Sequence, residues 1–543
     1  MKYNDFILTI EGKWEEGFLI KAVHKYGVGL NIKKDETGGP LPTFDAQRFF
    51  HNERQIKVFN EIQSAIHRRP YDHHFLTSFG EEMFRELFKE PIGKEFQFAR
   101  KIATATQCGL RIRLQLPSVL QGLPWELMLI KDDTESQFLC LNADMALIRS
   151  GTEDESDSLQ TVEFPLRILV VVSTPVDYPP LNTRGEINRL LQSLSIFISA
   201  GKVEIDFVDG PDTVSRLREL MKTSAYHILH FMGHSSEAGG PISMILEDDE
   251  RKGRSYDSVS LFQRLRNIQP PSLVFLNACK GASTSVISPL TSIAESLLDV
   301  GVSAVIAHQF EISDEAAEVF SKHIYEGLVT GTPIEESMTT ARCELSDEFP
   351  LECFTPVFFL RNTRGTLFLT RPGAQAREPE IELPIRRADE AARARRWSEA
   401  ADYALTALLI NHDHEQMKLR SEQALQQEEL DGFLHQATFS KSIKDWQEVV
   451  NWCDQYLNHS LAQTRPKAER AGAALMKLEI YLRQARRAEQ TREWADAASW
   501  YEQYMNDPAR RERPAAEQER IAMLRQVAQL GAGVRDPHLR WKG

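Results

Sequence analysis

Two uninterrupted apolar runs, residues 226–233 (YHILHFMG) and 272–278 (SLVFLNA), most constrain the fold of this chain. Continuous apolar character over this length is typical of strands that are covered on both faces, as in a parallel sheet. Between residues 166 and 360, such runs alternate with helix-like segments, for example LRILVVVST, GEINRLLQSLSIFISA and KVEIDFV. This βαβ rhythm predicts an α/β fold, with a mostly parallel sheet between two layers of helices.

Each of the two runs leads into a residue with chemical potential. His234 follows Gly233 at the end of the first predicted strand, and Cys279 follows the second. Open α/β sheets place catalytic groups outside the carboxyl ends of their strands, so we expect His234 and Cys279 to lie together. A cysteine is nucleophilic as its thiolate, and a neighbouring imidazole accepts the proton and supplies compensating charge. The sequence therefore predicts a cysteine hydrolase.

The composition excludes several other classes. The 64 basic and 78 acidic residues among 543 give a net charge of −14, which disfavours direct binding to nucleic acid or to an anionic membrane. The six cysteines form no CxxC pair, so neither a disulfide framework nor a structural zinc site is indicated. The start MKYNDFILTI has no signal-like apolar segment, and no apolar run approaches the roughly 18 residues of a spanning helix. We expect a cytoplasmic protein without a metal or cofactor.

The chain divides into five stretches. Residues 1–150 are mixed α/β, residues 151–165 form an acidic linker, residues 166–362 carry the βαβ rhythm, residues 363–384 are a proline-punctuated linker, and residues 385–543 are helical. Strand-like segments do not recur after residue 385.

The helical region contains an internal echo. The segments RRWSEAADYALTALL, KDWQEVVNWCDQYL and REWADAASWYEQYM align on Trp397, Trp446 and Trp494. The aromatic and small residues at helical spacing resemble the second helix of a tetratricopeptide (TPR) repeat, although the spacing exceeds the 34 residues of that repeat. A TPR-like stack and an ordinary helical bundle with core tryptophans both remain open, and either offers a protein-binding surface.

Several ordered motifs together resemble the CHAT peptidases, which are caspase-like cysteine proteases related to separase. LPWELM (123–128), HFMGH (230–234), LNACKG (276–281) and the stretch 288–342 are similar to that family's successive elements, over roughly residues 110–362. The resemblance implies a caspase-like three-layer α/β/α sandwich, with residues 1–150 as a pseudo-caspase-like or accessory half. It assigns His234 as general base and Cys279 as nucleophile, with the backbone N–H groups of Ser235 and Cys279 forming the oxyanion hole.

The resemblance also implies a biological setting. Bacterial relatives are associated with antiphage defence, including CRISPR-linked and gasdermin-cleaving systems. We therefore expect a protein substrate and a latent protease, released by a protein activator that binds the carboxyl-terminal helices.

The segment QFEISD (309–314) follows the strand that should line the specificity pocket, and it is similar to a separase-like pattern. Glu311 is the acidic residue expected to receive a basic P1 side chain, with Asp314 as the alternative if the alignment shifts. A carboxylate in a partly desolvated pocket favours Arg or Lys over Asp at P1.

Other residues have plainer interpretations. His227 and His230 lie inside an apolar run and are predicted to be core residues, and Asp72-His73-His74 has no distant partner set and is predicted to be an exposed turn. No GxxxxGK[ST], GxSxG or HExxH motif occurs, so an NTPase, a serine hydrolase and a zincin lack support. Two alternatives to an enzyme stay open: an inert caspase-like scaffold and a helical-repeat adaptor.

Overall fold

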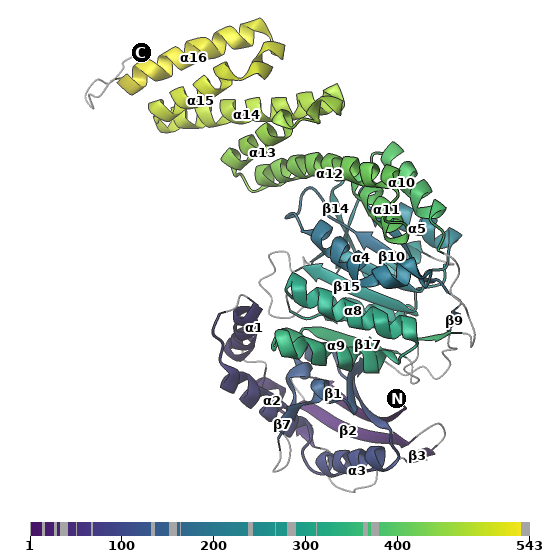
Figure 1. The fold of residues 1–543 in the computed structure, drawn as a ribbon. Coiled ribbons are helices and arrows are strands. Elements are labelled where there is room, and N and C mark those ends of the chain that lie inside the picture. Colours follow the sequence, from purple (N-terminus) through teal and green to yellow (C-terminus); the bar gives the residue numbers. More distant parts are fainter. Residues whose placement is uncertain are drawn as a thin grey trace. The chain divides into compact units, whose positions relative to one another are not determined.

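A computed structural model describes most of the chain (Figure 1). The described residues are 2–13, 17–26, 30–32, 42–49, 52–66, 69–131, 136–150, 160–162, 164–236, 243–265, 268–279, 289–310, 312–361, 367–370 and 379–533. They form two compact units. The sheet unit comprises Met1–Pro175 and Leu181–Ser421, and the helical unit comprises Val176–Pro180 and Glu422–Gly543.

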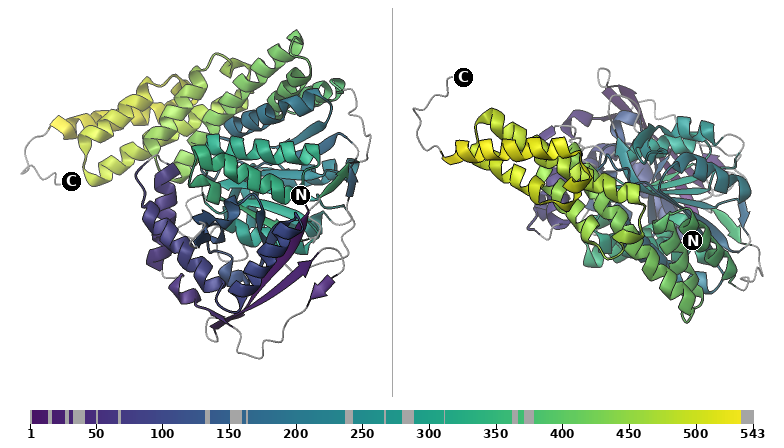
Figure 2. Two further views of the ribbon diagram at one scale, coloured as in Figure 1. Left: turned by 60° about the horizontal axis from the view of Figure 1, so that its bottom comes forward. Right: turned by 90° about the horizontal axis from the view of Figure 1, so that it is seen from above.

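A single mixed sheet runs through the sheet unit, in the order β11-β10-β12-β15-β16-β17-β8-β5-β1-β2-β3. Its first half is built from β1 (Tyr3–Lys13), β2 (Gly17–Tyr26), β3 (Leu30–Ile32), β4 (Thr43–Phe44), β5 (Gly109–Gln115) and β8 (Met145–Ser150). Its second half is built from β10 (Leu166–Val172), β11 (Val203–Asp209), β12 (Ile228–Ser236), β15 (Leu273–Cys279), β16 (Ala304–His308) and β17 (Pro356–Leu360). Strands of both halves belong to this one sheet, and the left view of Figure 2 shows the purple strands of the first half below the teal elements of the second.

Strand direction follows the predicted rhythm in the second half. β11, β10, β12, β15 and β16 are parallel to one another, as expected for strands separated by helices. β17 pairs with β16 in the antiparallel direction and with β8 in the parallel direction. The halves meet at this last pair, where Phe359 is opposite Arg149. The mostly parallel α/β/α prediction is confirmed.

Helices cover both faces of the second half. On one face lie α4 (Thr183–Ser199), α8 (Asp314–Thr330) and α9 (Ile334–Glu348), and on the other lie α5 (Thr213–Thr223), α6 (Ser258–Arg264) and α7 (Pro289–Asp299). The first half carries α1 (Asn52–Ile66), α2 (His73–Leu87) and α3 (Ile92–Ala105). Short elements complete the unit: β6 (Leu129–Lys131), β7 (Ser136–Phe138), and the hairpin of β13 (Ser243–Glu247) and β14 (Gly253–Tyr256), which extends β12.

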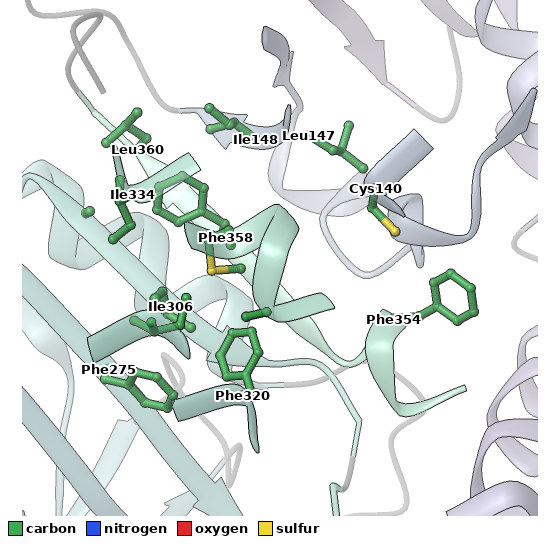
Figure 3. Packing of buried hydrophobic residues seen from close by; sticks show 14 of the residues in the cluster. Cys140, Leu147, Ile148, Phe275, Ile306, Phe320, Ile334, Phe354, Phe358 and Leu360 are labelled. Atoms are coloured by element: carbon green, nitrogen blue, oxygen red, sulfur yellow. The ribbon is translucent and has the colours of Figure 1, made fainter. Parts of the chain in front are cut away.

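One apolar core spans both halves of the sheet. Leu147 and Ile148 of β8 belong to the same buried cluster as Phe358 and Leu360 of β17 (Figure 3). Phe275 of β15 lies in this cluster as well. The second half is therefore packed directly on the first, and burial of this shared apolar surface favours their association.

The predicted linkers contain paired backbone. Residues 151–159 lie outside the described residues, but β9 (Gln160–Val162) pairs in parallel with β18 (Phe368–Thr370). Two stretches expected to be linkers thus form a small two-stranded sheet, separate from the main sheet.

The sheet unit also includes the first two helices of the region predicted to be a separate helical part. These are α10 (Glu382–Arg393) and α11 (Trp397–Ile410). On α11, the Tyr403 hydroxyl accepts a hydrogen bond from Phe207 N (3.0 Å) and donates one to Asp206 Oδ1 (3.0 Å). Glu399 accepts from Asp209 N at 2.8 Å. Because these contacts tie α11 to β11, the compact division falls at Ser421, whereas the sequence placed a boundary near residue 385.

The helical unit continues with α12 (Glu415–Ser442), which crosses that division, and with α13 (Trp446–Asn458), α14 (Lys467–Thr491), α15 (Trp494–Asn506) and α16 (Ala515–Gly533). α13 packs on α14, α14 on α15, and α15 on α16. Trp397, Trp446 and Trp494 are each the first residue of a helix, which confirms the predicted recurrence.

The recurrence extends to the backbone before each tryptophan. Two residues upstream stand Arg395 (φ 58°), Lys444 (φ 63°) and Arg492 (φ 62°), all in the left-handed region. A left-handed residue ends the first helix of each hairpin and redirects the chain into the second. Residues with a Cβ pay a steric penalty there that glycine escapes.

We predict that Lys444→Gly stabilises the helical unit by about 0.5–1 kcal/mol, because glycine relieves the left-handed strain at this corner. Lys441→Gly, three residues earlier within α12, is the matched control and should lose about 1 kcal/mol through helix propensity. Urea unfolding of the two variants measures both effects. A loss of stability in Lys444→Gly equal to that of the control would contradict this account of the corner.

Candidate active site

The two residues singled out in the sequence are neighbours across paired strands. β12 and β15 are parallel, and their register sets Met232 opposite Asn277 and His234 opposite Cys279. Hydrogen-bonded strands lie about 4.8 Å apart, so the backbones of His234 and Cys279 are in the closest proximity that a sheet allows. Cys279 is described by its backbone position alone.

His234 is held in a tightly packed position, with 1% of its surface exposed. A Cβ at the preceding Gly233 would lie 2.7 Å from Phe231 Cζ and 3.1 Å from Ser173 O. Only glycine fits this approach without a shift of its neighbours. His234 also pairs with Ile245 of the β13–β14 hairpin, which extends the strand beyond the main sheet.

A chain of polar side chains lies at the same edge of the sheet. Asn277, two residues before Cys279, donates from Nδ2 to Glu186 Oε2 of α4 at 3.0 Å. Its Oδ1 lies 3.2 Å from Nδ1 of His308, the last residue of β16. Burial lowers the pKa of His308 to about 4, so its imidazole is neutral near pH 7 and donates from Nδ1 to Asn277. These three residues were not predicted as site residues, although a polar residue inside an apolar strand was a usable signal.

Of the other two histidines in the first motif, His230 is a buried core residue, as predicted, whereas His227 lies just before β12 and is only half-buried. His230 Nδ1 lies 2.7 Å from the Tyr325 hydroxyl, and its ring stacks on Phe275 with centroids 4.6 Å apart. Burial lowers its pKa to about 3. His227 Nδ1 accepts from Arg167 N at 2.9 Å, and burial lowers its pKa to about 4.

Of the residues predicted for the oxyanion hole and the specificity pocket, Ser235 has a described side chain, whereas Glu311 and the Asp314 side chain do not. Ser235 is half-buried on β12 opposite Met244, with a negative φ, so serine is sterically acceptable there. Glu311 lies outside the described residues, and Asp314 is described only as the first residue of α8. The start of α8 is fixed by Ser313, whose N and Oγ donate to the carboxylate of Glu352 at 2.5 and 2.9 Å.

The LPWELM segment forms a buried polar junction between the halves of the sheet. Glu126 Oε2 accepts from Arg149 Nη2 at 2.5 Å and from Gln309 Nε2 at 2.8 Å. Arg149 Nη2 also donates to Gln309 Oε1 at 2.9 Å. None of these side chains is exposed by more than 4%. Because Gln309 directly follows His308, the junction fixes the carboxyl end of β16 beside the strand that carries Cys279.

A second contact joins Gln121, two residues before this segment, to α7, the next described helix after Cys279 in sequence. Gln121 Nε2 donates to Glu295 Oε1 at 2.5 Å. Burial raises the pKa of Glu295 to about 7, in spite of this hydrogen bond.

Burial keeps most of the other cysteines in the thiol form. It raises the pKa of Cys140 and of Cys453 to about 12, that of Cys353 well above its usual range, and that of Cys343 to a smaller extent. Cys108 is half-buried. Four of the remaining five cysteines are therefore poor nucleophiles at neutral pH.

The described residues contain no cluster of side chains that could form a metal-binding site. Asp72 caps α2 by accepting from Phe75 N at 2.9 Å and pairs with Lys57. Asp72, His73 and His74 are exposed, as predicted, but they lie at the start of a helix and not in a turn, because the Asp72 carboxylate caps that helix. Within the described ranges, no three His, Cys, Asp or Glu residues gather as metal ligands do. In the same ranges, no helix combines the length and apolar character needed to cross a membrane.

Comparison with known proteins identifies one family. The family model described as CHAT domain matches residues 77–401, more than half of the chain, and its match extends into α11. No curated protein sequence matches.

Among solved structures, the Saccharomyces cerevisiae separase–securin complex aligns with 12% identity and a TM-score of 0.32, over 66% of this chain and 30% of that chain. This chain therefore spans less than a third of the matched one. A likeness at this score supports no inference about activity.

We predict that Glu126→Leu costs about 3–5 kcal/mol of unfolding free energy, because it leaves the Arg149 charge buried and unpaired. Addition of Arg149→Met to this variant should recover part of the loss, since both charges are then absent. The matched control is Glu11→Ala at the exposed Lys21–Glu11 pair, which should cost less than about 1 kcal/mol. Denaturant unfolding of the full chain measures all three, and additive losses in the double variant would contradict a coupled buried pair.

We also predict that the sheet unit loses stability on acidification. The pKa of His308 is lowered from 6.5 unfolded to about 4 folded, so the unfolded state binds the proton more readily. The stabilisation is complete above pH 6.5 and is lost as the pH falls toward 4, by about 1.4 kcal/mol per pH unit. Between pH 6.5 and 5, His308→Gln should therefore lose about 2 kcal/mol less than the unaltered protein.

The control for this experiment is His412→Gln, since the His412 side chain is 91% exposed. Its unfolding free energy should follow the unaltered protein at both pH values. An unchanged pH dependence in His308→Gln would show that this histidine does not titrate on unfolding.

Proposed function

The chain belongs to the CHAT domain family, and from this membership we propose that it is a cysteine endopeptidase with Cys279 as nucleophile and His234 as general base. One observation carries the proposal. His234 and Cys279, the histidine–cysteine pair that the sequence singled out, are cross-strand neighbours in the register of β12 and β15. The raised thiol pKa of four other cysteines supports the choice of nucleophile.

The proposed reaction has two stages. His234 takes the proton from Cys279, and the thiolate attacks the carbonyl carbon of the scissile peptide bond. Backbone N–H groups of Ser235 and Cys279 would stabilise the oxyanion of the tetrahedral intermediate. His234 protonates the departing amine, which leaves a thioester on Cys279. The same imidazole then takes a proton from water, whose oxygen attacks the thioester and releases the acid and the free thiol.

The polar chain beside the pair has a positioning role in this proposal. Glu186 and His308 hold the Asn277 side chain from both sides, so they restrain the strand two residues before the nucleophile. Chemistry of this kind is sensitive to displacements of about 1 Å, and a restrained strand limits them.

Substrate preference and control remain proposals that extend the first. A basic residue at P1 is proposed from Glu311, with Asp314 as the alternative acceptor. The substrate is proposed to be a protein, and activity is proposed to stay low until a protein activator binds the helical unit. The proposed setting is bacterial antiphage defence.

One structural link supports such control. The segment Val176–Pro180 belongs to the helical unit, where His435 Nε2 lies 3.3 Å from Tyr178 O. In sequence it joins β10 to α4, the helix that carries Glu186.

Alkylation tests the proposal without knowledge of the substrate. At pH 7 we expect iodoacetamide to modify Cys279 at least tenfold faster than the half-buried Cys108, because an imidazole-paired thiol is largely thiolate whereas an isolated one is not. Peptide mass spectrometry of the full chain gives both rates. His234→Ala should reduce the Cys279 rate to that of Cys108, while His412→Ala, at an exposed histidine, should leave it unchanged.

The same variants address turnover once a cleaved protein is found. Cys279→Ala and His234→Ala should each abolish cleavage, whereas Cys108→Ala should retain it. Equal alkylation of Cys279 in the presence and absence of His234, together with cleavage by Cys279→Ala, would falsify the pair and favour the scaffold interpretation.

A further inference from the structure

The helical unit contains a cavity of about 1210 Å³ away from the candidate active site. Its walls are the second half of α14 and the first half of α16, and the buried Tyr501 of α15 contributes to its lining. α15 packs against both α14 and α16, so a single helix holds the two walls in place (Figure 1). Trp446 and Lys444, at the α12–α13 corner, complete it.

The lining is strongly basic. It includes six cationic and two anionic side chains: Lys444, Arg483, Arg486, Arg487, Arg513 and Arg520, against Glu479 and Glu517. The chain as a whole has a net charge of −14. A local excess of positive charge inside an acidic protein creates a field that attracts anionic groups to this cavity.

Most of these cations form no ion pair with a carboxylate among the described residues of the unit. Arg513 pairs with Glu517 at 3.2 Å. In the described part of the chain, the structure records no ion pair for the other five cations. Arg483, Arg486 and Arg487 stand at positions i, i+3 and i+4 of α14, where like charges repel and destabilise a helix by about 0.2–0.5 kcal/mol per pair. A bound anion would relieve this repulsion.

The cavity also offers apolar and hydrogen-bonding groups. The guanidinium of Arg483 lies 4.3 Å from the ring centroid of Trp446, and Leu482 and Ile521 line the same space. Gln484 lines it as well, and its Nε2 is buried without a hydrogen-bond acceptor among the described residues. A buried amide donor without an acceptor is unfavourable, and a carbonyl or carboxylate oxygen would satisfy it.

These features fit an extended peptide better than other anions. The volume exceeds the 300–1,000 Å³ that is usual for small-molecule pockets. A long nucleic acid would meet the repulsion of the whole acidic chain, whereas a short segment experiences the local field. Apolar contacts beside the cations suit a segment in which acidic residues flank an apolar one.

We propose that the cavity between α14 and α16 binds an extended acidic peptide segment of a partner protein. Its carboxylates pair with Arg486, Arg487 and Arg520, and an apolar side chain contacts Trp446. The inference rests on the proposed function, because it identifies the segment by which the proposed activator docks as acidic. Its test measures binding alone and is independent of peptidase activity.

The probe is a fluorescein-labelled twelve-residue peptide of Asp and Glu with a central Leu-Leu pair, titrated with the full chain. We expect saturable binding that weakens at least tenfold between low and moderate salt, as charge pairing requires. The variant Arg486→Glu/Arg520→Glu should weaken binding at least tenfold. Arg511→Glu, an exposed arginine of the same unit outside the cavity, should change it less than twofold.

Two further measurements separate the alternatives. The peptide should quench tryptophan fluorescence, and Trp446→Phe should remove most of that quenching. A scrambled peptide with Lys and Arg in place of Asp and Glu should not bind. The proposal is overturned by an absence of acidic-peptide binding, by equal weakening in Arg511→Glu, by tighter binding of an oligothymidylate of matched charge, or by a cavity variant that instead dissociates a dimer of the chain.

Discussion

Three buried arginines of the first half of the sheet hold the second half in place. Arg111 pairs with Asp5 and with Glu335 at the start of α9, both at 2.5 Å, and Arg113 donates to Leu360 O of β17 at 3.3 Å. Arg149 engages Glu126 and Gln309. Burial disfavours each charge, but the pKa of Arg111 is raised because Glu335 and Asp5 outweigh that penalty. A guanidinium without its partners is costly in this setting, so the two halves are obliged to assemble in one arrangement.

Local patterns were sufficient to predict the second half of the sheet. Apolar runs of strand length define β10, β12, β15 and β16, and proline at the first helical position of α7 marks where that helix begins. The pairing of His234 with Cys279 followed from the rule that parallel strands align their carboxyl ends. The recurrence of segments aligned on Trp397, Trp446 and Trp494 predicted repeated helical hairpins, and in the structure each tryptophan begins a helix because one repeated sequence folds into one repeated corner.

The missed features depend on contacts between distant residues. Nothing local to Gln309 indicates a hydrogen bond to Glu126, which is 183 positions earlier in the chain. The pairing of Phe359 with Arg149, which joins the two halves of the sheet, could not be predicted from the sequence either. An edge strand and a central strand have similar apolar patterns. α11 has the composition of the repeat helices that follow it, yet its buried Glu399 and Tyr403 join it to β11. The spacing of apolar residues along a helix predicts which side chains are buried, but it does not predict which helix or strand they pack against.

The short segment Val176–Pro180 belongs to the helical unit, although stretches of the sheet unit flank it in the sequence. In sequence it lies between two stretches of the sheet unit, but it contacts a helix more than two hundred positions later in the chain. If a different set of helices replaced the helical unit, this segment would lose the surface against which it now packs. Exchange of helical units between related proteins therefore requires a matched change in an internal loop. A fusion at the domain border alone would leave this internal segment unmatched to the new helices.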